Sequence, residues 1–222
     1  MDYNSVASPR TAAAGLEINK VLKNTYLLLS ATIIFSAVTA FFSMSMGMSV
    51  NTYLYSVIGA FLLGIFVLPR TANSSAGIGV IFLITGLLGF GLGPIINYYL
   101  QAANGAQIVT TALGGTGIIF LGLSGYVLTT KKDFTFMAGF LMTGMMVILL
   151  GILANLFLNI PAFSLAISAG VIMLMSGFIL FDTSRIVRGG ETNYIMATYG
   201  MYLSIFNIFI HLLNILGFMG DD

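Results

Sequence analysis

The stretch Phe178-Ile-Leu-Phe-Asp-Thr-Ser-Arg-Ile-Val-Arg-Gly-Gly-Glu-Thr-Asn193 decides how the chain can fold. Its first residues continue a long apolar segment, and its second half ends that segment with Arg185, Arg188, two glycines and Glu191. Asp182 is embedded in the apolar part. A carboxylate at the centre of a membrane helix costs roughly 2.5–3.5 kcal/mol to insert, so such a residue is expected to have a function and a partner. The rest of the sequence predicts the scaffold around it.

The composition is that of a membrane protein. Of the 222 residues, 58% are hydrophobic and 7% are charged, and the mean hydropathy is +1.02, whereas about a quarter of the residues in a soluble domain are charged. The net charge is +1 and the basic residues form no stripe, so nucleic acid is not an expected partner. The chain has no cysteine, which leaves Asp, Glu and one His as possible metal ligands. No cofactor is predicted.

Seven segments are apolar and long enough to cross a bilayer, which takes about 17–25 residues. Polar or helix-breaking sequences such as Pro69-Arg70 and Lys131-Lys132-Asp133 separate them. We therefore predict an all-α polytopic membrane protein, with a cytosolic N-terminal tail at 1–22 and one seven-helix transmembrane domain at 23–222. The predicted spans are 24–46, 51–69, 77–99, 107–129, 134–158, 162–186 and 193–218.

The basic residues predict how the chain is oriented. All 8 Lys and Arg residues lie before the first span or near connections on that same side of the membrane, and the opposite connections contain none. Lys and Arg concentrate in cytoplasmic loops. The N-terminus is therefore expected in the cytoplasm and the C-terminal Asp221-Asp222 outside.

Close packing between helices is expected where small residues cluster. The densest cluster is in the third span, where Gly86, Gly89, Gly91 and Gly93 precede Pro94. Proline leaves one helix carbonyl without its usual donor. Two interpretations follow: a kinked, tightly packed helix, which we favour, and a break that lines a pore.

The residues that could form a catalytic pair lie at different depths. Gly122-Leu-Ser124-Gly125 and the single His211 invite comparison with the Ser and His of intramembrane proteases. At 1.5 Å per residue, Ser124 lies about 8 Å from the cytoplasmic edge and His211 about 27 Å. A gap of about 20 Å prevents the hydrogen bond that a serine nucleophile needs. The sequence contains no HExxH, P-loop or paired intramembrane aspartates either, so no enzymatic activity is predicted.

Asp182 has two interpretations that the residues leave open. In the first it forms an ion pair with Arg185, three positions later on the same helix, which offsets the burial of its charge. In the second it faces the bundle interior and changes its protonation state near neutral pH. The seventh span offers it a polar face, because polar residues recur there at steps of three or four: Ser204, Asn207, His211 and Asn214.

Motifs spread over roughly residues 20–219 carry a family resemblance. They are Asn24-Thr-Tyr-Leu-Leu-Leu-Ser30, Gly93-Pro-Ile-Ile-Asn-Tyr-Tyr-Leu100, Leu128-Thr-Thr-Lys-Lys-Asp-Phe134, Phe181-Asp182, Gly189-Gly-Glu-Thr-Asn-Tyr-Ile195 and the segment from Tyr202 to Gly217. Taken together, they resemble the Bax inhibitor family of seven-helix membrane proteins, in particular its bacterial branch that modulates the FtsH membrane AAA protease. The resemblance implies a fold in which six helices ring a central seventh helix.

One activity that the resemblance implies is a pH-dependent calcium leak. In some bacterial relatives, two aspartates that face each other from the sixth and seventh helices gate the leak together with an arginine near the end of the second. Asp182 matches the first aspartate, Arg70 is the nearest match to the arginine, and the second aspartate falls on Ser204. Two carboxylates that share a proton respond to pH through mutual repulsion, and a carboxylate facing a hydroxyl has no such coupling. This difference argues against the calcium gate, which we keep as the alternative function.

The other implied activity, which we rank first, is inhibition of FtsH by a protein–protein interaction. The chain would occupy the protease as a poor substrate and so slow the degradation of other membrane proteins. The polar tail from Met1 to about Lys20 is expected to be unstructured and to serve as the segment that the protease grips; an inert leader is the alternative. The predicted location is a bacterial inner membrane. The predicted partners are FtsH and the lipid bilayer, with calcium only in the alternative.

Overall fold

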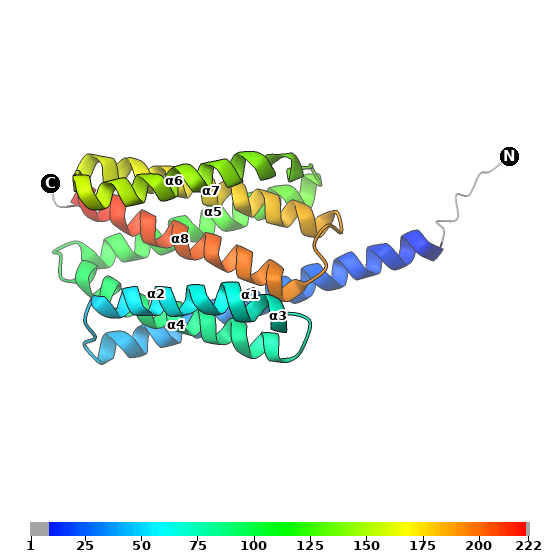
Figure 1. The fold of residues 1–222 in the computed structure, drawn as a ribbon, viewed down its shortest axis with the longest axis horizontal. Helices are drawn as coiled ribbons and strands as arrows, with labels where there is room; N and C mark the ends of the chain where they lie inside the picture. Colours follow the sequence, from blue (N-terminus) through cyan, green and yellow to red (C-terminus); the bar gives the residue numbers. More distant parts are fainter. Residues whose placement is uncertain (1–8, 221–222) are drawn as a thin grey trace.

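The structure, a computed structural model, describes residues 9–220, and side chains from residue 15 onward. Its described part has seven helical spans that are long and apolar enough to cross a membrane, which confirms the predicted fold class and number of spans. The elements, shown in Figure 1, are α1 (Pro9–Ser45), α2 (Asn51–Leu62), the π-helix η1 (Leu63–Val67), α3 (Leu68–Thr71), α4 (Ala76–Leu100), α5 (Gly105–Thr130), the 3-10 helix η2 (Thr135–Met137), α6 (Ala138–Leu158), α7 (Pro161–Val187) and α8 (Tyr194–Gly220).

The last five spans begin and end within two residues of their predicted limits. Local chemistry sets these limits. Pro161 begins α7, where the absent N–H of proline has no helical acceptor to lose. Beyond the other end of α7, Gly189 adopts a positive φ of 73°, which glycine tolerates best.

Helix α1 begins well before its predicted start. The tail expected to be unstructured is helical from Pro9 onward, so that expectation is wrong for residues 9–20, while residues 1–8 and Asp221-Asp222 lie outside the described residues. Proline fits a first helical turn, and the alanines that follow favour helix. With 37 residues, α1 is about 55 Å long, roughly 25 Å longer than the hydrocarbon core of a bilayer. Figure 1 shows its first turns projecting past the other helices.

The second span is not one regular α-helix, because α2 passes through η1 into α3. Pro69 has no N–H to donate to the preceding turn, and its ring crowds that turn, so the helix widens just ahead of it. Gly64 lies in the widened turn against the phenol of Tyr199 on α8, and an added Cβ would overlap the Tyr199 ring and hydroxyl. The irregular turn therefore lets the second span approach the last helix.

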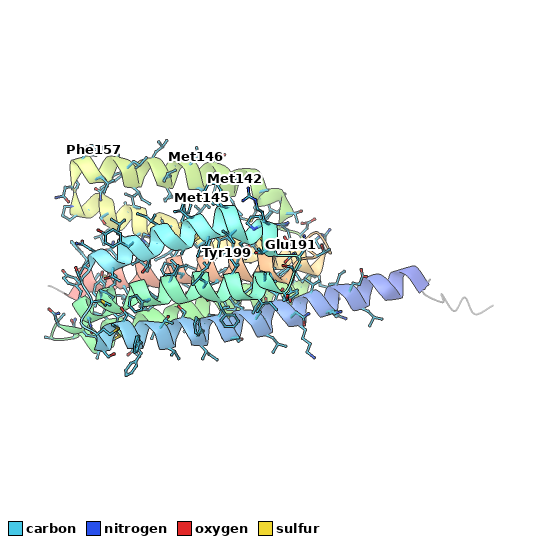
Figure 2. All side chains as sticks on the ribbon, turned by 60° about the horizontal axis from the view of Figure 1, so that its bottom comes forward. Met142, Met145, Met146, Phe157, Glu191 and Tyr199 are labelled. Atoms are coloured by element: carbon cyan, nitrogen blue, oxygen red, sulfur yellow. The ribbon has the colours of Figure 1, made fainter. Side chains whose placement is uncertain are left out.

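Helix α8 is central, as the resemblance implies, but its immediate neighbours are fewer than six. It packs on α1, α4, α5 and α7, whereas α2 packs mainly on α4 and α6 mainly on α7. In Figure 1, α8 runs between a group formed by α1, α2 and α4 and a group formed by α5, α6 and α7. Helix α6 is peripheral, and side chains such as Met142, Met146 and Phe157 along it are exposed (Figure 2).

The glycines of α4 allow it to pack closely on its neighbours. A Cβ at Gly89 would overlap the backbone carbonyl oxygen of Ser36 on α1, and one at Gly93 would lie 2.7 Å from the Cβ of Ser43. Gly91 faces α2 in the same way. These contacts agree with the favoured interpretation of the glycine cluster as a packing surface.

The connections gather at two ends of the bundle. At the end that carries the basic loops, Arg188 forms an ion pair with Asp133 at 3.0 Å. Hydrogen bonds from Thr135, aided by the charge of Arg188, hold the pKa of Asp133 below its usual value. At the other end, the side chain of Asn97 donates to the carbonyl of Met44. Which end faces the cytoplasm stays a prediction from the basic residues.

Candidate functional site: the polar face of helix α8

The start of α8 is joined to the loop before α4 by Asn193. Its Oδ1 accepts hydrogen bonds from the backbone N–H groups of Ile195 and Met196, at 2.9 and 3.0 Å, which caps the helix. Its Nδ2 donates to the Ala72 carbonyl at 3.0 Å and to Asn73 Oδ1 at 2.8 Å. The Asn193 side chain therefore caps α8 and also joins this helix end to the loop between α3 and α4.

Arg185 forms no ion pair with Asp182, so the first of the two interpretations left open for Asp182 does not hold. Its Nη2 donates to Glu191 Oε2 at 3.0 Å, and Glu191 Oε1 accepts from the N–H of Asn193 at 2.9 Å. The loop after α7 turns back over the helix end and brings Glu191 to the guanidinium. An ion pair at the end of a span keeps more of its hydration than one within it. Figure 2 shows Glu191 at the end of the bundle from which α1 projects.

The carboxylate of Asp182 points at α8. It lies against Gly200, where an added Cβ would be 2.9 Å from Asp182 Oδ2. Asp182 is partly buried, and within residues 9–220 no hydrogen bond or ion pair joins its carboxylate to another residue. The sequence offered no clear sign of this contact, because the space comes from a glycine in a helix that has others.

The two other residues matched to the calcium gate form no hydrogen bond or ion pair with Asp182. Ser204 is buried one turn beyond Gly200 and donates to the Gly200 carbonyl at 3.1 Å. Arg70 is exposed and donates to the carbonyl of Phe66 on its own segment. Both side chains therefore make their hydrogen bonds within their own helical segment.

The last two turns of the predicted polar face contact α7. The Nδ1 of His211 is 3.0 Å from the Oγ of Ser168, and Asn214 Nδ2 donates to Ser168 at 3.0 Å and to Ser164 at 3.3 Å. Asn207 instead donates to the Leu203 carbonyl of α8 itself, at 2.8 Å. Of the four residues of the predicted polar face, His211 and Asn214 hydrogen-bond to a second helix, whereas Ser204 and Asn207 bond within α8.

Two polar contacts of α8 with α1 escaped the sequence reasoning. Tyr202 is 3% exposed; its hydroxyl lies 2.6 Å from Ser36 Oγ and donates to the Thr85 carbonyl at 3.3 Å. Thr198 donates to the carbonyl of Thr25 at 3.2 Å. Both residues fall off the face defined by Ser204 and His211, and tyrosine and threonine are common enough in membrane helices to give no distinct signal.

Ser124 binds other partners than His211. Its hydroxyl is hydrogen-bonded to the Tyr26 hydroxyl of α1 and lies 3.4 Å from Thr183 Oγ1 of α7. His211 pairs with Ser168. The geometry therefore agrees with the depth argument, and these two residues form no nucleophile and base pair.

The polar groups of α8 mainly form hydrogen bonds to other parts of the bundle. They reach the loop before α4 through Asn193, α1 and α4 through Tyr202, and α7 through His211 and Asn214. In the part of the chain that the structure describes, no group of three or more His, Cys, Asp or Glu side chains could hold a metal ion. The fold and site define a seven-helix membrane protein. Its last helix is central and hydrogen-bonds to neighbouring helices through polar side chains.

Comparison with known proteins gives the family. The sequence profile of the family described as inhibitor of apoptosis-promoting Bax1 matches residues 18–221. The chain belongs to this Bax inhibitor family, as the motifs predicted. It is 49% identical to an uncharacterized membrane protein of Vibrio cholerae, over 93% of each chain. It is 48% identical to the protein of Escherichia coli K12 named modulator of FtsH protease YccA, over 98% of each chain.

The names of the relatives also bear on location. The YccA sequence of a second Escherichia coli strain, again 48% identical over 98% of each chain, is named an inner membrane protein. A Pseudomonas aeruginosa relative, 44% identical over 93% of this chain, carries no functional name. The seven spans make this chain a multi-pass membrane protein, and its predicted inner-membrane location agrees with the name of the Escherichia coli relative.

Proposed function

We propose that this protein inhibits an FtsH-type membrane protease by binding to it as a substrate that is hard to unfold. The observation that carries the proposal is helix α1, whose first turns continue past the bundle at the end that carries the basic loops. A projecting segment is where a machine that pulls on membrane proteins could begin. The relative named as a modulator of FtsH, which aligns over 98% of the chain, supports the same function.

The bundle offers physical reasons for slow extraction. Helix α1 is held to α4 by close glycine contacts and to α8 by the buried hydrogen bonds of Tyr202 and Thr198. A buried hydrogen bond contributes about 0.5–1.5 kcal/mol, and the loss of one partner leaves the other unsatisfied where no water can replace it. Drawing α1 out of the bundle therefore exposes several such groups together. A protease that has bound this chain would therefore process it slowly, and during that time it could not degrade other substrates.

We expect deletion of residues 2–20 to abolish inhibition of the protease without unfolding the bundle, because the deletion removes the projecting turns and leaves the predicted span intact. The measurement is the degradation rate of a reporter membrane protein by purified FtsH in vesicles, with and without the variant. A second variant replaces residues 2–20 by a Gly/Ser sequence of equal length. It shows whether the protease needs only a projecting segment of this length or this particular sequence. Full inhibition by the deletion variant, with an unchanged midpoint of thermal unfolding, would reject the proposal.

The second candidate function is a cation leak in which Asp182 is the titrating group. The observation that favours it is the carboxylate at Gly200, which has no hydrogen-bonded or ion-paired partner among the described residues. The absence of a second carboxylate at Ser204 counts against it, since a single carboxylate lacks the coupling of a shared proton.

Calcium flux through reconstituted protein discriminates between the two functions. Under the first proposal we expect flux no greater than that of protein-free vesicles at acidic, neutral and basic pH. The matched variants are Asp182→Asn and Asp133→Asn, because Asp133 is an exposed carboxylate in a loop at the bundle end. Flux that disappears in Asp182→Asn and persists in Asp133→Asn would rank the channel first.

A further inference from the structure

A cavity of about 350 Å³ opens between α1 and α5. Its rim carries exposed apolar side chains, with Phe41 73% and Leu113 57% exposed, and its floor is formed by α8, where Phe206 and Phe209 are 7% and 6% exposed. Within the described part of the chain, α1 and α5 both pack on α8. They meet each other through the hydrogen-bonded side chains of Tyr26 and Ser124, neither of which lines the cavity. The cavity is therefore a side opening that leads from the surface of the bundle to its central helix.

The cavity lies within the membrane-spanning part of the bundle. Its α1 wall comes from the second half of that helix, from Ile33 to Met44, and its α5 wall runs from Leu113 to Phe120. Leu113 is eight residues, or about 12 Å, from the start of α5 at the end opposite the basic loops. The opening thus faces hydrocarbon in the half of the membrane away from those loops.

The chemistry of the walls selects an apolar occupant. The side chains are almost all aliphatic or aromatic, and the hydroxyls of Ser36 and Tyr202 are already hydrogen-bonded to each other. Thr116 donates to the Ala112 carbonyl of its own helix. These bonds use the donor protons of all three hydroxyls, so the cavity offers a polar ligand no free hydroxyl donor. Packed interiors rarely leave a space of this size empty.

We propose that the acyl chain of a bilayer phospholipid enters this cavity and packs against α8, at Phe206 and Phe209. The proposal is independent of the protease interaction. Hydrocarbon is the medium at the opening, so this occupant needs no transfer out of water. A second copy of the protein, or another partner, would have to insert a helix of about 10 Å diameter between α1 and α5 in order to contact α8.

Photolabelling can detect this occupant. The wild-type protein is reconstituted in vesicles of phosphatidylethanolamine and phosphatidylglycerol that contain a phosphatidylethanolamine with a diazirine in its acyl chain. Labelled peptides are mapped by mass spectrometry, and labelling of the lipid-exposed helix α6 is the internal reference. We expect labels on Phe206 and Phe209, because these buried side chains form the floor of the cavity.

Two variants narrow the cavity from opposite walls. Gly117 of α5 and the exposed Ala37 of α1 line the cavity, and an added Cβ at Gly117 meets no atom within 4 Å. Gly117→Leu and Ala37→Leu therefore each place a larger side chain at the cavity wall. We expect each variant to lower labelling of Phe206 about fivefold relative to α6, because the added leucine side chain takes the space of the lipid acyl chain. The matched control is Gly122→Leu, whose Cβ is equally free but which does not line the cavity, and it should label like the wild type.

Three results would overturn the proposal. One is wild-type labelling of α6 without labelling of Phe206 and Phe209. Another is labelling of α8 that both Gly117→Leu and Ala37→Leu leave unchanged although both variants fold. The third is a wild-type dimer in native mass spectrometry that Gly117→Leu converts to monomer, which would show that a second copy occupies the opening.

Discussion

Gly89→Ala should destabilise the bundle, although alanine is the better helix former. An added Cβ at Gly89 would overlap the Ser36 carbonyl oxygen and the Thr39 hydroxyl, so α1 and α4 must move apart. Forced overpacking of this kind costs about 1–3 kcal/mol and here acts against a backbone atom that cannot rotate away. We expect a net loss even after the gain in helix propensity of about 1 kcal/mol, measured as a lower midpoint of thermal or denaturant unfolding in detergent.

The control for this prediction is Gly79→Ala in the same helix. A Cβ at Gly79 meets no atom within 4 Å, and the residue is exposed. This variant gains helix propensity without a clash, so its unfolding midpoint should rise or stay unchanged. Equal midpoints for Gly89→Ala and Gly79→Ala would mean that α1 and α4 do not approach as closely as the structure has them.

Asn193→Ala should give the other large loss of stability, because it removes four hydrogen bonds at the junction of α8 and the loop before α4. Loss of an N-cap costs about 0.5–2 kcal/mol and each further hydrogen bond about 0.5–1.5 kcal/mol. We therefore expect a total of about 2–4 kcal/mol at this site. Amide hydrogen exchange should become faster first in the turn that contains Ile195 and Met196.

Two further variants separate the roles of Asn193. Asn193→Asp keeps the oxygen that caps α8 but replaces the donor to Ala72 and Asn73, so its loss should be intermediate. Asn51→Ala is the matched control, because Asn51 is exposed at the start of α2 and its side chain makes no hydrogen bond to another described residue. If Asn193→Ala unfolds at the same denaturant concentration as Asn51→Ala, the junction contributes nothing to stability.

The sequence predicts the spans of this protein well because their limits depend on local chemistry. Proline at the start of α7 and the basic cluster after α5 act within a turn of their own position. The π-helix before Pro69 was missed because it also depends on where Tyr199 of α8 lies, more than a hundred residues later. The polarity of the first residues of α1 predicts disorder, but the proline at its first turn and the alanines that follow favour helix.

The candidate site was harder to predict than the fold. Arg185 has a carboxylate three residues before it and another six residues after it, and only the path of the loop decides that Glu191 is the partner. The contacts of Tyr202 with Ser36 and Thr85 join residues 166 and 117 positions apart. A single sequence does not show how the helices are aligned against one another. Periodicity therefore places Ser204, Asn207, His211 and Asn214 on one face of a helix, but it does not predict which neighbouring helix each of them contacts.

The length of helix α1 has a mechanical consequence. A force applied near Pro9 acts along the axis of a helix that continues unbroken to Ser45. The glycine contacts with α4 and the hydrogen bonds with α8 are then loaded in shear, all at the same time, instead of being peeled away one after another from an end. Resistance to forced unfolding depends on the rate of the slowest rupture event. The helix that offers a place to pull is thus also the one that distributes the load most widely.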